Sequence, residues 1–338
     1  MLDSPLAVSA AADPAIATMP SYEIVIPAYN ARSTIGETIA SLLAQTYPPA
    51  RIIVADDGSS DDTERAVREY PSISYVRFEH TGISGVQNRA LRLVDSGLVA
   101  LVDSDDLWHP DTGRVLVECL KDDQFVAASV RPSPFLRGPW AGAVQPVPTD
   151  LHWKEVTLPE MLRENLLAKS GTMIAVAPVR AVGGYSESLT SCEDLDLWLR
   201  LMESGGRIVR TQWQGLGWRM RPGTMSRQPT MLVNLLTVVM PRVMADPELT
   251  SRDARRLARR AWLQTLARAA NDRRDLHEVP RLSDVVDVLA EDVPVGSMTK
   301  LGERVVASRL AGSAAAGWRC YRSVRGVVRS AVGRTGRD

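Results

Sequence analysis

Short apolar runs alternate with stretches of helical periodicity over the first third of the chain. The expected strands and helices follow one another in this order: 23–28, 33–45, 51–55, 61–70, 73–78, 83–95 and 98–102. Alternation of this kind is typical of βαβ units around a mostly parallel sheet. The pattern therefore predicts an α/β fold with a doubly wound, mostly parallel sheet.

The pattern loosens after Pro110. Residues 131–150 contain five prolines, which predict a long irregular loop. Further elements are expected in this order: a helix at 157–168, a strand at 171–177, a helix at 192–204, a strand at 207–213 and helices from 231 onward. The predicted organisation is a leader at 1–20, an α/β domain at 21–228, a helical region at 229–298 and a basic tail at 299–338.

Composition places the chain among globular proteins of a reducing compartment. It is 45% hydrophobic with a formal charge of zero, and its three cysteines are widely spaced without a CxxC pattern. Neither a disulfide framework nor a zinc site is indicated. The first twenty residues contain no lysine or arginine, so we expect a disordered leader rather than a secretory signal. The sequence contains no run of 18 uncharged apolar residues, so a transmembrane helix is not expected. We expect a cytoplasmic protein.

The tail is strongly basic. Residues 300–338 hold nine lysines and arginines against two acidic residues. Trp318, Tyr321 and Val324 recur at helical spacing among arginines, which is typical of a basic amphipathic helix on an anionic membrane surface. A helix packed on the rest of the protein, or a tail without a partner, is the alternative. No nucleic-acid motif accompanies the basic residues, so a nucleic-acid partner is not expected.

Polar clusters follow three of the expected strands. The clusters are Pro27-Ala-Tyr-Asn30, Asp56-Asp-Gly-Ser59 and Asp103-Ser-Asp-Asp106. In open α/β sheets, ligands bind outside the carboxyl ends of the strands. We therefore expect these three loops to converge on one crevice.

The third cluster has the composition of a divalent-cation site. In an extended backbone Asp103 and Asp105 would point the same way, so both could address one Mg²⁺ or Mn²⁺ ion bridging a diphosphate. The alternatives are a solvated turn, or a helix cap formed by Asp105 or Asp106 ahead of a helix near Pro110. The spacing alone leaves these interpretations open.

The second cluster lies where a strand passes into a helix. The carboxylate of Asp57 could accept a hydrogen bond from a nucleobase, and a plain turn with good helix capping is the alternative. The four histidines show no ligand spacing and are expected to be structural or on the surface.

Five stretches occur in the following order: IVIPAYNARSTIGETIASLLAQTYPPARIIVADDGSSDDT, HTGISGVQNRAL, LVALVDSDDLWHPD, VGGYSESLTSCEDLDLWLRL and GWRMRPGTMS. Together they resemble the family 2 glycosyltransferases with the GT-A fold, over residues 22–226. The resemblance implies that 21–228 is a catalytic domain with a nucleotide-binding half and an acceptor half. It implies an inverting enzyme that moves a sugar from a nucleotide diphosphate, usually UDP, to a hydroxyl of a glycan, a lipid-linked acceptor or a secondary metabolite.

The resemblance also implies site residues. Those matching the nucleotide-binding positions are Pro27, Ala28 and Tyr29 beneath the nucleotide, Asp57 at the base, Arg89 at the phosphates and Asp103 at the ribose. Asp105 matches the metal position, with Mn²⁺ or Mg²⁺ as the expected cofactor. Arg221 stands where the family often has a metal-binding histidine, and we expect Arg219 or Arg221 to grip the diphosphate instead.

Asp194 matches the general base, with Glu193 beside it. A competing interpretation is a capping box, in which Asp194 reaches back to Ser191 at the start of a helix. Trp108 could cover the sugar or nucleotide, or pack beneath the acidic loop.

Two other classes of protein remain as alternatives. A nucleotidyltransferase would need a Gly-rich basic loop after the first strand, which Pro27-Ala-Tyr-Asn30 is not. A non-catalytic nucleotide- or glycan-binding module would be expected to lack the acids. A lipid-linked acceptor would place the protein peripherally on the inner face of the membrane.

Overall fold

The computed structural model describes residues 19–121, 123–136, 139–220, 234–235, 237–239 and 242. The leader up to residue 18, Arg221, most of the 229–298 region and the tail lie outside these residues. The described residues fall into two compact units. The first comprises the described parts of Met1–Val156, Leu167–Gly184 and Ser204–Arg219, and the second those of Thr157–Leu166, Tyr185–Glu203 and Met220–Asp338.

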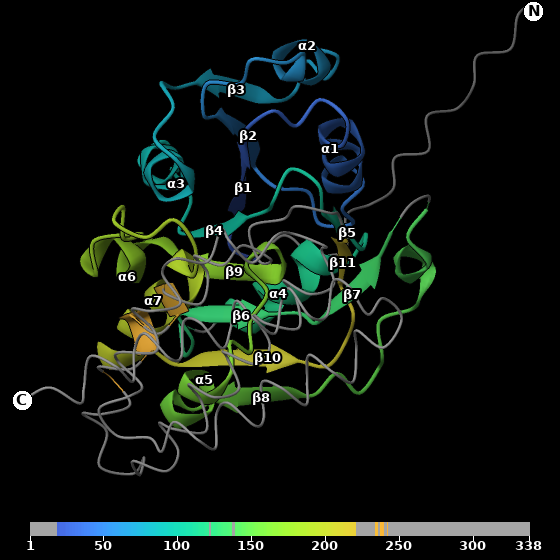
Figure 1. Ribbon diagram of the computed structural model, residues 1–338. Helices are drawn as coiled ribbons and strands as arrows, with labels where there is room; N and C mark the ends of the chain where they lie inside the picture. The colour runs from blue at the N-terminus through green and yellow to red at the C-terminus, as the bar shows by residue number, and fades with distance from the viewer. Residues whose placement is uncertain are drawn as a thin grey trace, which may run out of the picture. The chain divides into compact units, whose positions relative to one another are not determined.

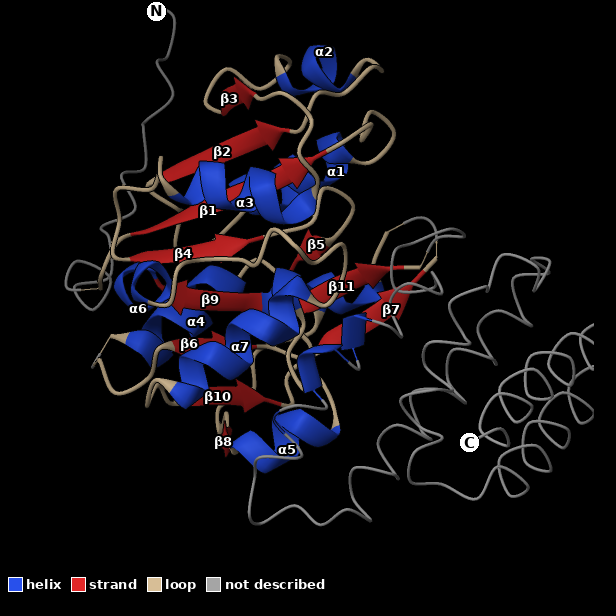
Figure 2. Cartoon of the chain, turned by 60° about the vertical axis from the view of Figure 1, so that its left-hand side comes forward, coloured by secondary structure: helices blue, strands red, loops and turns tan. Residues whose placement is uncertain are grey.

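The first unit is built on a mixed, mostly parallel sheet (Figure 2). Its strands are, in sheet order, β3 (Ser74–Arg77), β2 (Arg51–Asp56), β1 (Tyr22–Ala28), β4 (Leu98–Leu101), β9 (Thr172–Ala175), β6 (Ala127–Ser129), β10 (Ile208–Thr211) and β8 (Trp153–Val156). The strands β3, β2, β1 and β4 are parallel to one another. Strand β9 runs antiparallel to both β4 and β6, and β8 runs antiparallel to β10. The predicted α/β fold class is confirmed.

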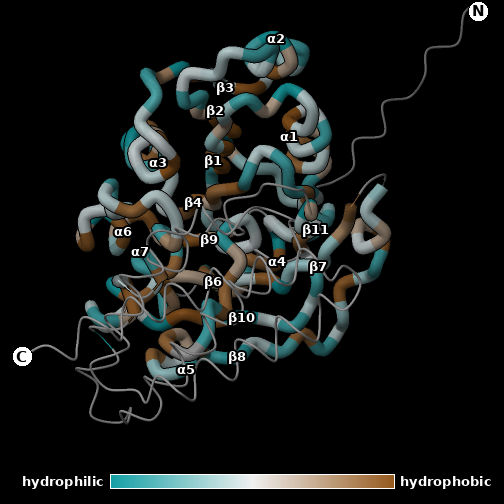
Figure 3. Tube along the Cα trace, viewed as in Figure 1, coloured by the Kyte–Doolittle hydropathy of each residue, from teal (hydrophilic) through white to brown (hydrophobic). Residues whose placement is uncertain are grey.

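The central strands are buried on both faces. Every residue of β1 is buried, and Ile24 and Ile26 are fully so. Helices α1 (Ile35–Leu43) and α3 (Ile83–Leu91) lie on opposite faces of β1 and β2 (Figure 1), and the strands between them are hydrophobic (Figure 3). A parallel sheet covered on both faces requires such continuous apolar strands. This is why the sequence predicted these elements correctly.

The remaining helices of the first unit are short or cover the second half of the sheet. They are α2 (Thr63–Val67), α4 (Thr112–Leu120) and α6 (Val176–Ala181), with the 3₁₀ helices η2 (Ala141–Val144) and η3 (Lys169–Gly171). Helix α4 packs against β6 and β9, and α6 packs against β9.

A second, three-stranded sheet includes part of the stretch expected to be an irregular loop. Strand β11 (Leu216–Arg219) lies between β5 (Leu107–Trp108) and β7 (Pro132–Phe135). The prediction of a wholly irregular 131–150 was wrong, because β7 and η2 lie within it. Proline is tolerated in β7 because an edge strand needs its N–H groups on one side only.

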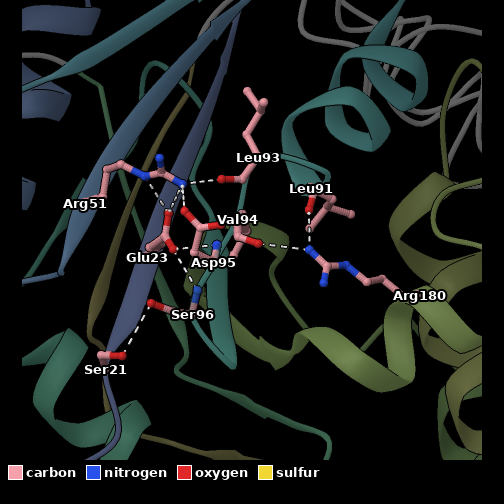
Figure 4. A network of polar contacts seen from close by, with 9 residues as sticks. All are labelled: Ser21, Glu23, Arg51, Leu91, Leu93, Val94, Asp95, Ser96 and Arg180. Atoms are coloured by element: carbon pink, nitrogen blue, oxygen red, sulfur yellow. Dashed lines mark hydrogen bonds and ion pairs between the residues drawn. The ribbon is translucent and has the colours of Figure 1, made fainter.

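A polar network fixes the connection between α3 and β4 (Figure 4). The buried carboxylate of Glu23 accepts the backbone N–H groups of Asp95 at 2.8 Å and Ser96 at 2.7 Å, and Nε of Arg51 donates to it at 2.8 Å. Burial opposes ionisation, yet the Ser96 amide, the Arg51 guanidinium and the Asp95 amide together lower the pKa of Glu23. From the other side, Arg180 donates to the carbonyls of Leu91 and Val94 at 3.0 and 2.9 Å.

The second unit holds two packed helices, α5 (Leu158–Arg163) and α7 (Glu193–Glu203). A capping box between Thr157 and Glu160 begins α5. Arg242 donates to Asp196 at 3.3 Å and to Glu203 at 2.6 Å, so it joins the residues near 242 to α7. Among the residues that the structure describes, no helix has the length and apolar character to cross a bilayer.

Candidate functional site

Three parallel strands bring the polar loops to one edge of the sheet. Ala28 at the end of β1 pairs with Asp56 at the end of β2, and Val25 pairs with Leu101 at the end of β4. The first two loops are in direct contact, since the N–H of Asn30 donates to Oγ of Ser59 at 2.9 Å. The strands therefore place the three polar loops at one edge of the sheet, as predicted.

The first loop is held rigidly by its asparagine. Asn30 has a φ of 51°, and its side-chain oxygen accepts the N–H groups of Ser60 at 2.8 Å and Asp61 at 3.3 Å. Asparagine tolerates this left-handed conformation better than most residues. Pro27 and Ala28 are the last residues of the buried strand, whereas Tyr29 is 52% exposed.

Asp57 organises the start of α3. Its carboxylate accepts the N–H groups of Thr81 at 2.8 Å and Gly82 at 2.9 Å, and its Oδ2 lies 2.8 Å from Nδ1 of His80. Gly82 precedes α3 with a φ of 81°. The carboxylate therefore fixes the 80–82 turn, and its contact with a nucleobase stays a prediction.

His80 and Tyr29 form an exposed aromatic pair. Their ring centroids are 4.6 Å apart at an interplanar angle of 32°. Nothing in the sequence indicated this pair, because His80 has no ligand spacing and is 51 residues from Tyr29. Two tilted aromatic rings beside a carboxylate offer a surface on which a nucleobase could lie.

Residues 103–106 form a turn, which is one of the alternatives that the sequence left open, and not an extended segment. The N–H of Asp106 donates to the carbonyl of Asp103 at 3.1 Å, so Ser104 and Asp105 are the central residues. Aspartate and serine both favour such turns. We call residues 103–106 the acid turn. Helix α4 begins later, with Asp111 before its first residue, so neither Asp105 nor Asp106 caps it.

Asp106 points into the protein. It is 3% exposed, and it accepts the backbone N–H of Arg219 at 3.0 Å. Burial raises the pKa of this carboxyl well above its usual range, and the neighbouring charges of Asp103 and Asp105 raise it further. Asp106 is therefore an anchor for the turn, while Asp103 keeps a side chain that is 39% exposed.

Within the described part of the chain, Lys169 and Arg219 contact the acid turn. Nζ of Lys169 lies 2.8 Å from Oδ1 of Asp103, with the lysine side chain 9% exposed. Arg219 donates through Nε to the carbonyl of Asp105 at 2.8 Å and through Nη2 to Glu37 at 2.6 Å. The resemblance pointed to Arg219, whereas nothing in the sequence pointed to Lys169, 66 residues away from Asp103.

The side chains of Arg89 and Trp108 each donate a hydrogen bond to a backbone carbonyl. Arg89 donates to the carbonyl of Glu79 at 3.0 Å and lies over the ring of Phe78. Trp108 is 1% exposed and donates to the carbonyl of Ser170 at 2.6 Å. The structure thus places Trp108 in the packing position, one of the two alternatives open from the sequence.

Glu193 and Asp194 belong to the second unit. Oδ2 of Asp194 accepts a hydrogen bond from Asn165 at 3.1 Å, and Glu193 is 4% exposed. Helix α7 begins at Glu193, and Cys192 has a φ of 59°, outside the helical range. Ser191 is therefore not the residue before the first helical position, which the capping box required.

The carboxylates of the acid turn could hold a divalent cation only together with oxygen atoms from a bound substrate. Among the described residues no three His, Cys, Asp or Glu side chains are grouped as a metal site. Asp103 and Asp105 offer hard oxygen atoms, and Oδ1 of Asp103 is already in contact with the ammonium of Lys169. Magnesium is commonly held by one or two carboxylates together with substrate phosphates, and this donor set fits that arrangement.

Comparison with known proteins identifies the family. Residues 23–176 match the family described as Glycosyl transferase family 2. This segment is a family 2 glycosyltransferase domain. The chain is 26% identical over 191 residues to the chondroitin synthase of Escherichia coli, covering 55% of this chain and 27% of that protein.

Two further relatives are more similar over shorter stretches. The E. coli UDP-Glc:alpha-D-GlcNAc-diphosphoundecaprenol beta-1,3-glucosyltransferase WfgD is 40% identical over 88 residues, 25% of this chain and 35% of that protein. The putative teichuronic acid biosynthesis glycosyltransferase TuaG of Bacillus subtilis is 35% identical over 98 residues, 27% of this chain and 38% of that protein. The chain thus spans well under half the length of these relatives.

Solved structures agree on the fold. Residues 1–349 of TarS from S. aureus, in complex with UDP-GlcNAc, match with a TM-score of 0.58 and 19% identity over 92% of both chains. The same segment in complex with UDP gives a TM-score of 0.56. The family 2 glycosyltransferase domain therefore has the GT-A fold.

Proposed function

We propose that the protein is an inverting glycosyltransferase that moves a sugar from a UDP-sugar to an acceptor hydroxyl. The observation that carries this is the acid turn of a family 2 domain at the carboxyl ends of β1, β2 and β4, with Asp57 and the Tyr29–His80 pair at the same edge. A carboxylate-lined turn and a stacking surface at this edge suit a nucleoside diphosphate.

Relatives support a UDP donor. WfgD is named for UDP-Glc, and TarS was solved with UDP-GlcNAc. In this proposal the base lies against Tyr29, with Asp57 holding the 80–82 turn and Asp103 directed to the ribose. Pro27 and Ala28 form the floor of the nucleotide site, and Arg89 is assigned to the phosphates by resemblance.

The transfer needs one base and one stabilised leaving group. The carboxylate of Asp194 takes the proton of the acceptor hydroxyl as its oxygen bonds to the anomeric carbon, with Glu193 supporting the base. The bond from that carbon to the diphosphate breaks with both electrons leaving on UDP. Attack from the face opposite UDP inverts the configuration of the sugar.

A divalent cation, Mn²⁺ or Mg²⁺, would be held by Asp105 with Asp103 and would supply Lewis-acid neutralisation of the departing diphosphate. Arg219 holds the acid turn in place through the carbonyl of Asp105. Arg221 is assigned to the diphosphate in place of a metal-binding histidine.

We propose a glycan or lipid-linked acceptor. WfgD is named for a diphosphoundecaprenol acceptor and TuaG for teichuronic acid biosynthesis. The basic residues of 300–338 would then bring the enzyme to an anionic membrane surface from the cytoplasmic side. Flotation with liposomes, with and without this segment, measures that contact.

Nucleotide binding is the first test. Thermal unfolding is followed with UDP, GDP, CDP and dTDP, each with and without Mn²⁺, for the wild type and Asp105→Ala. We expect UDP with Mn²⁺ to raise Tm in the wild type and not in Asp105→Ala, because a ligand that binds only the folded state stabilises it.

Asp95→Asn is the matched control. Its carboxylate lies in the α3–β4 connection and is 87% exposed, so its loss should leave the UDP shift intact. If no nucleotide raised Tm, the result would favour the alternative in which the protein is a catalytically degenerate binding module. A shift without any requirement for Mn²⁺ would mean that cations of the chain replace the metal.

A further inference from the structure

The 3₁₀ helix η3 is built against the acid turn. Oγ of Ser170 accepts the N–H of Asp103 at 3.0 Å, and the carbonyl of Ser170 accepts Nε1 of Trp108 at 2.6 Å. Gly171, the last residue of η3, is also held by backbone hydrogen bonds. Its N–H donates to the carbonyl of Ala168, and its carbonyl accepts the N–H of Val130. Lys169 therefore projects from a fixed backbone toward Asp103.

The Lys169–Asp103 pair is half-buried. Nζ lies 2.8 Å from Oδ1, and the lysine side chain is 9% exposed. An ammonium removed from water needs an anionic partner, and a pair in this position is screened less than one on the surface. The pair is thus a fixed feature of the acid turn rather than a chance surface contact.

Arg219 and Asp106, two other ionisable side chains at the turn, have hydrogen-bond partners within the protein. Arg219 divides its guanidinium between the carbonyl of Asp105 and the carboxylate of Glu37. Asp106 is buried and bound to the backbone of Arg219. Among the residues that the structure describes, the ammonium of Lys169 is a positive charge placed directly on a carboxylate of the acid turn.

A divalent cation and this ammonium compete for the same oxygen. A metal ion bound to Asp103 would lie only a few ångströms from Nζ, and two cations at that distance repel each other. A diphosphate at the site removes the conflict, because its oxygens give both the metal and the ammonium new anionic partners.

We propose that Lys169 is the resident counter-ion of Asp103, and that it delays loading of the divalent cation until a nucleoside diphosphate binds. This rests on the proposed function for the identity of the diphosphate. The competition between ammonium and metal at Asp103 does not depend on sugar transfer, so it is tested separately.

The test is Mn²⁺ binding in the absence of nucleotide, followed by the electron paramagnetic resonance signal of free Mn²⁺. We expect Lys169→Met to bind Mn²⁺ about tenfold more tightly than the wild type, because the repulsion is gone. Lys169→Arg should remain close to the wild type, and Lys169→Met with Asp103→Asn should lose the gain. Lys121→Met removes an exposed charge at the end of α4 and should change nothing.

Equal Mn²⁺ affinity in the wild type and Lys169→Met would overturn the proposal, as would an equal gain in Lys121→Met. Thermal stabilisation of the wild type by UDP is measured alongside. If UDP binds and the Mn²⁺ affinities are equal, only the role of Lys169 fails; if the affinities differ and no nucleotide binds, only the proposed donor fails.

A double-mutant cycle covers the case in which Lys169→Met folds poorly. Unfolding free energies are measured for the wild type, Asp103→Asn, Lys169→Met and the double variant. A counter-ion pair predicts coupling, with the double variant more stable than the sum of the single losses allows. Additive losses would contradict the pairing.

Discussion

The backbone N–H of Arg219 donates to Oδ1 of Asp106 at 3.0 Å, and this single bond ties the end of β11 to the acid turn. The side chain of Arg219 extends the tie to the carbonyl of Asp105 and to Glu37 in α1. It also lies over the ring of Phe135, with 4.6 Å from Cζ to the ring centroid. One residue thus joins the small sheet, the acid turn and α1.

Arg219→Lys should weaken this connection. A lysine has one ammonium and cannot reach the Asp105 carbonyl and Glu37 with the planar fork of a guanidinium. We expect a loss of about 1–3 kcal/mol in the free energy of unfolding, the range for hydrogen bonds to charged groups. Urea denaturation measures the loss, and the UDP-induced rise in Tm should fall with it.

Glu37→Gln is the control for Arg219. The Glu37 side chain is 59% exposed, so loss of its charge should cost less than about 1 kcal/mol. If Glu37→Gln cost as much as Arg219→Lys, the surface ion pair rather than the bond to Asp105 would hold the turn.

Gly184→Ala should destabilise the protein more than Gly183→Ala. Both glycines have positive φ, 84° at 183 and 72° at 184, so alanine at either costs about 1–2 kcal/mol in backbone strain. A Cβ at 184 would also lie 2.5 Å from Oδ1 of Asn88, whereas a Cβ at 183 meets nothing within 4 Å. Thermal unfolding of the two variants isolates the clash, and Asn88→Ala should remove the difference between them. Equal losses in the original background would argue that Asn88 simply moves aside.

The sequence predicted the first half of the sheet well and the second half less well. Strands β1, β2 and β4 are apolar on both faces, which is a local property of the sequence. The antiparallel direction of β9 is not local, because it follows from which strands it pairs with. A strand near 171–177 was predicted, but its direction was not.

In the candidate site, too, local features were predicted from the sequence and long-range contacts were not. Asp103, Asp105 and Asp57 were visible as clusters at strand ends, and the parallel strands place their loops at one edge of the sheet. Lys169 and His80 were missed, since only the folded chain brings them to Asp103 and Tyr29. The sequence left open whether 103–106 is extended or a turn. The structure shows the turn, which aspartate and serine favour and which directs Asp106 inward.

Glu23→Gln should lower stability at neutral pH and much less in acid. The pKa of Glu23 is lowered in the folded protein, so its ionised form contributes stability above the unfolded pKa of about 4.3. That contribution is lost as the pH falls through the folded pKa. We expect a loss of about 1–3 kcal/mol at pH 7, the range for hydrogen bonds to a charged group.

Urea unfolding at pH 7 and at successively lower pH below the unfolded pKa measures this. The difference between the wild type and Glu23→Gln should shrink toward acid pH. Glu64→Gln breaks an exposed pair with Arg68 and should cost less than about 0.5 kcal/mol throughout. A constant difference for Glu23→Gln at all pH values would mean that shape, not charge, matters at this position.

Asp194→Asn should abolish sugar transfer and leave UDP binding unchanged. The amide keeps the shape of the carboxylate but cannot accept the proton of the acceptor hydroxyl, so we expect kcat to fall about 10²–10⁴-fold. Transfer to the acceptor is measured by release of UDP, and donor affinity by calorimetry with UDP and Mn²⁺. Asn165→Ala removes the hydrogen bond to Oδ2 of Asp194 at 3.1 Å and should reduce kcat far less. Since the carboxylate starts a helix, the free energy of unfolding is measured for both variants. Loss of UDP binding and of stability together in Asp194→Asn would assign this residue to the structure of α7 rather than to the chemistry.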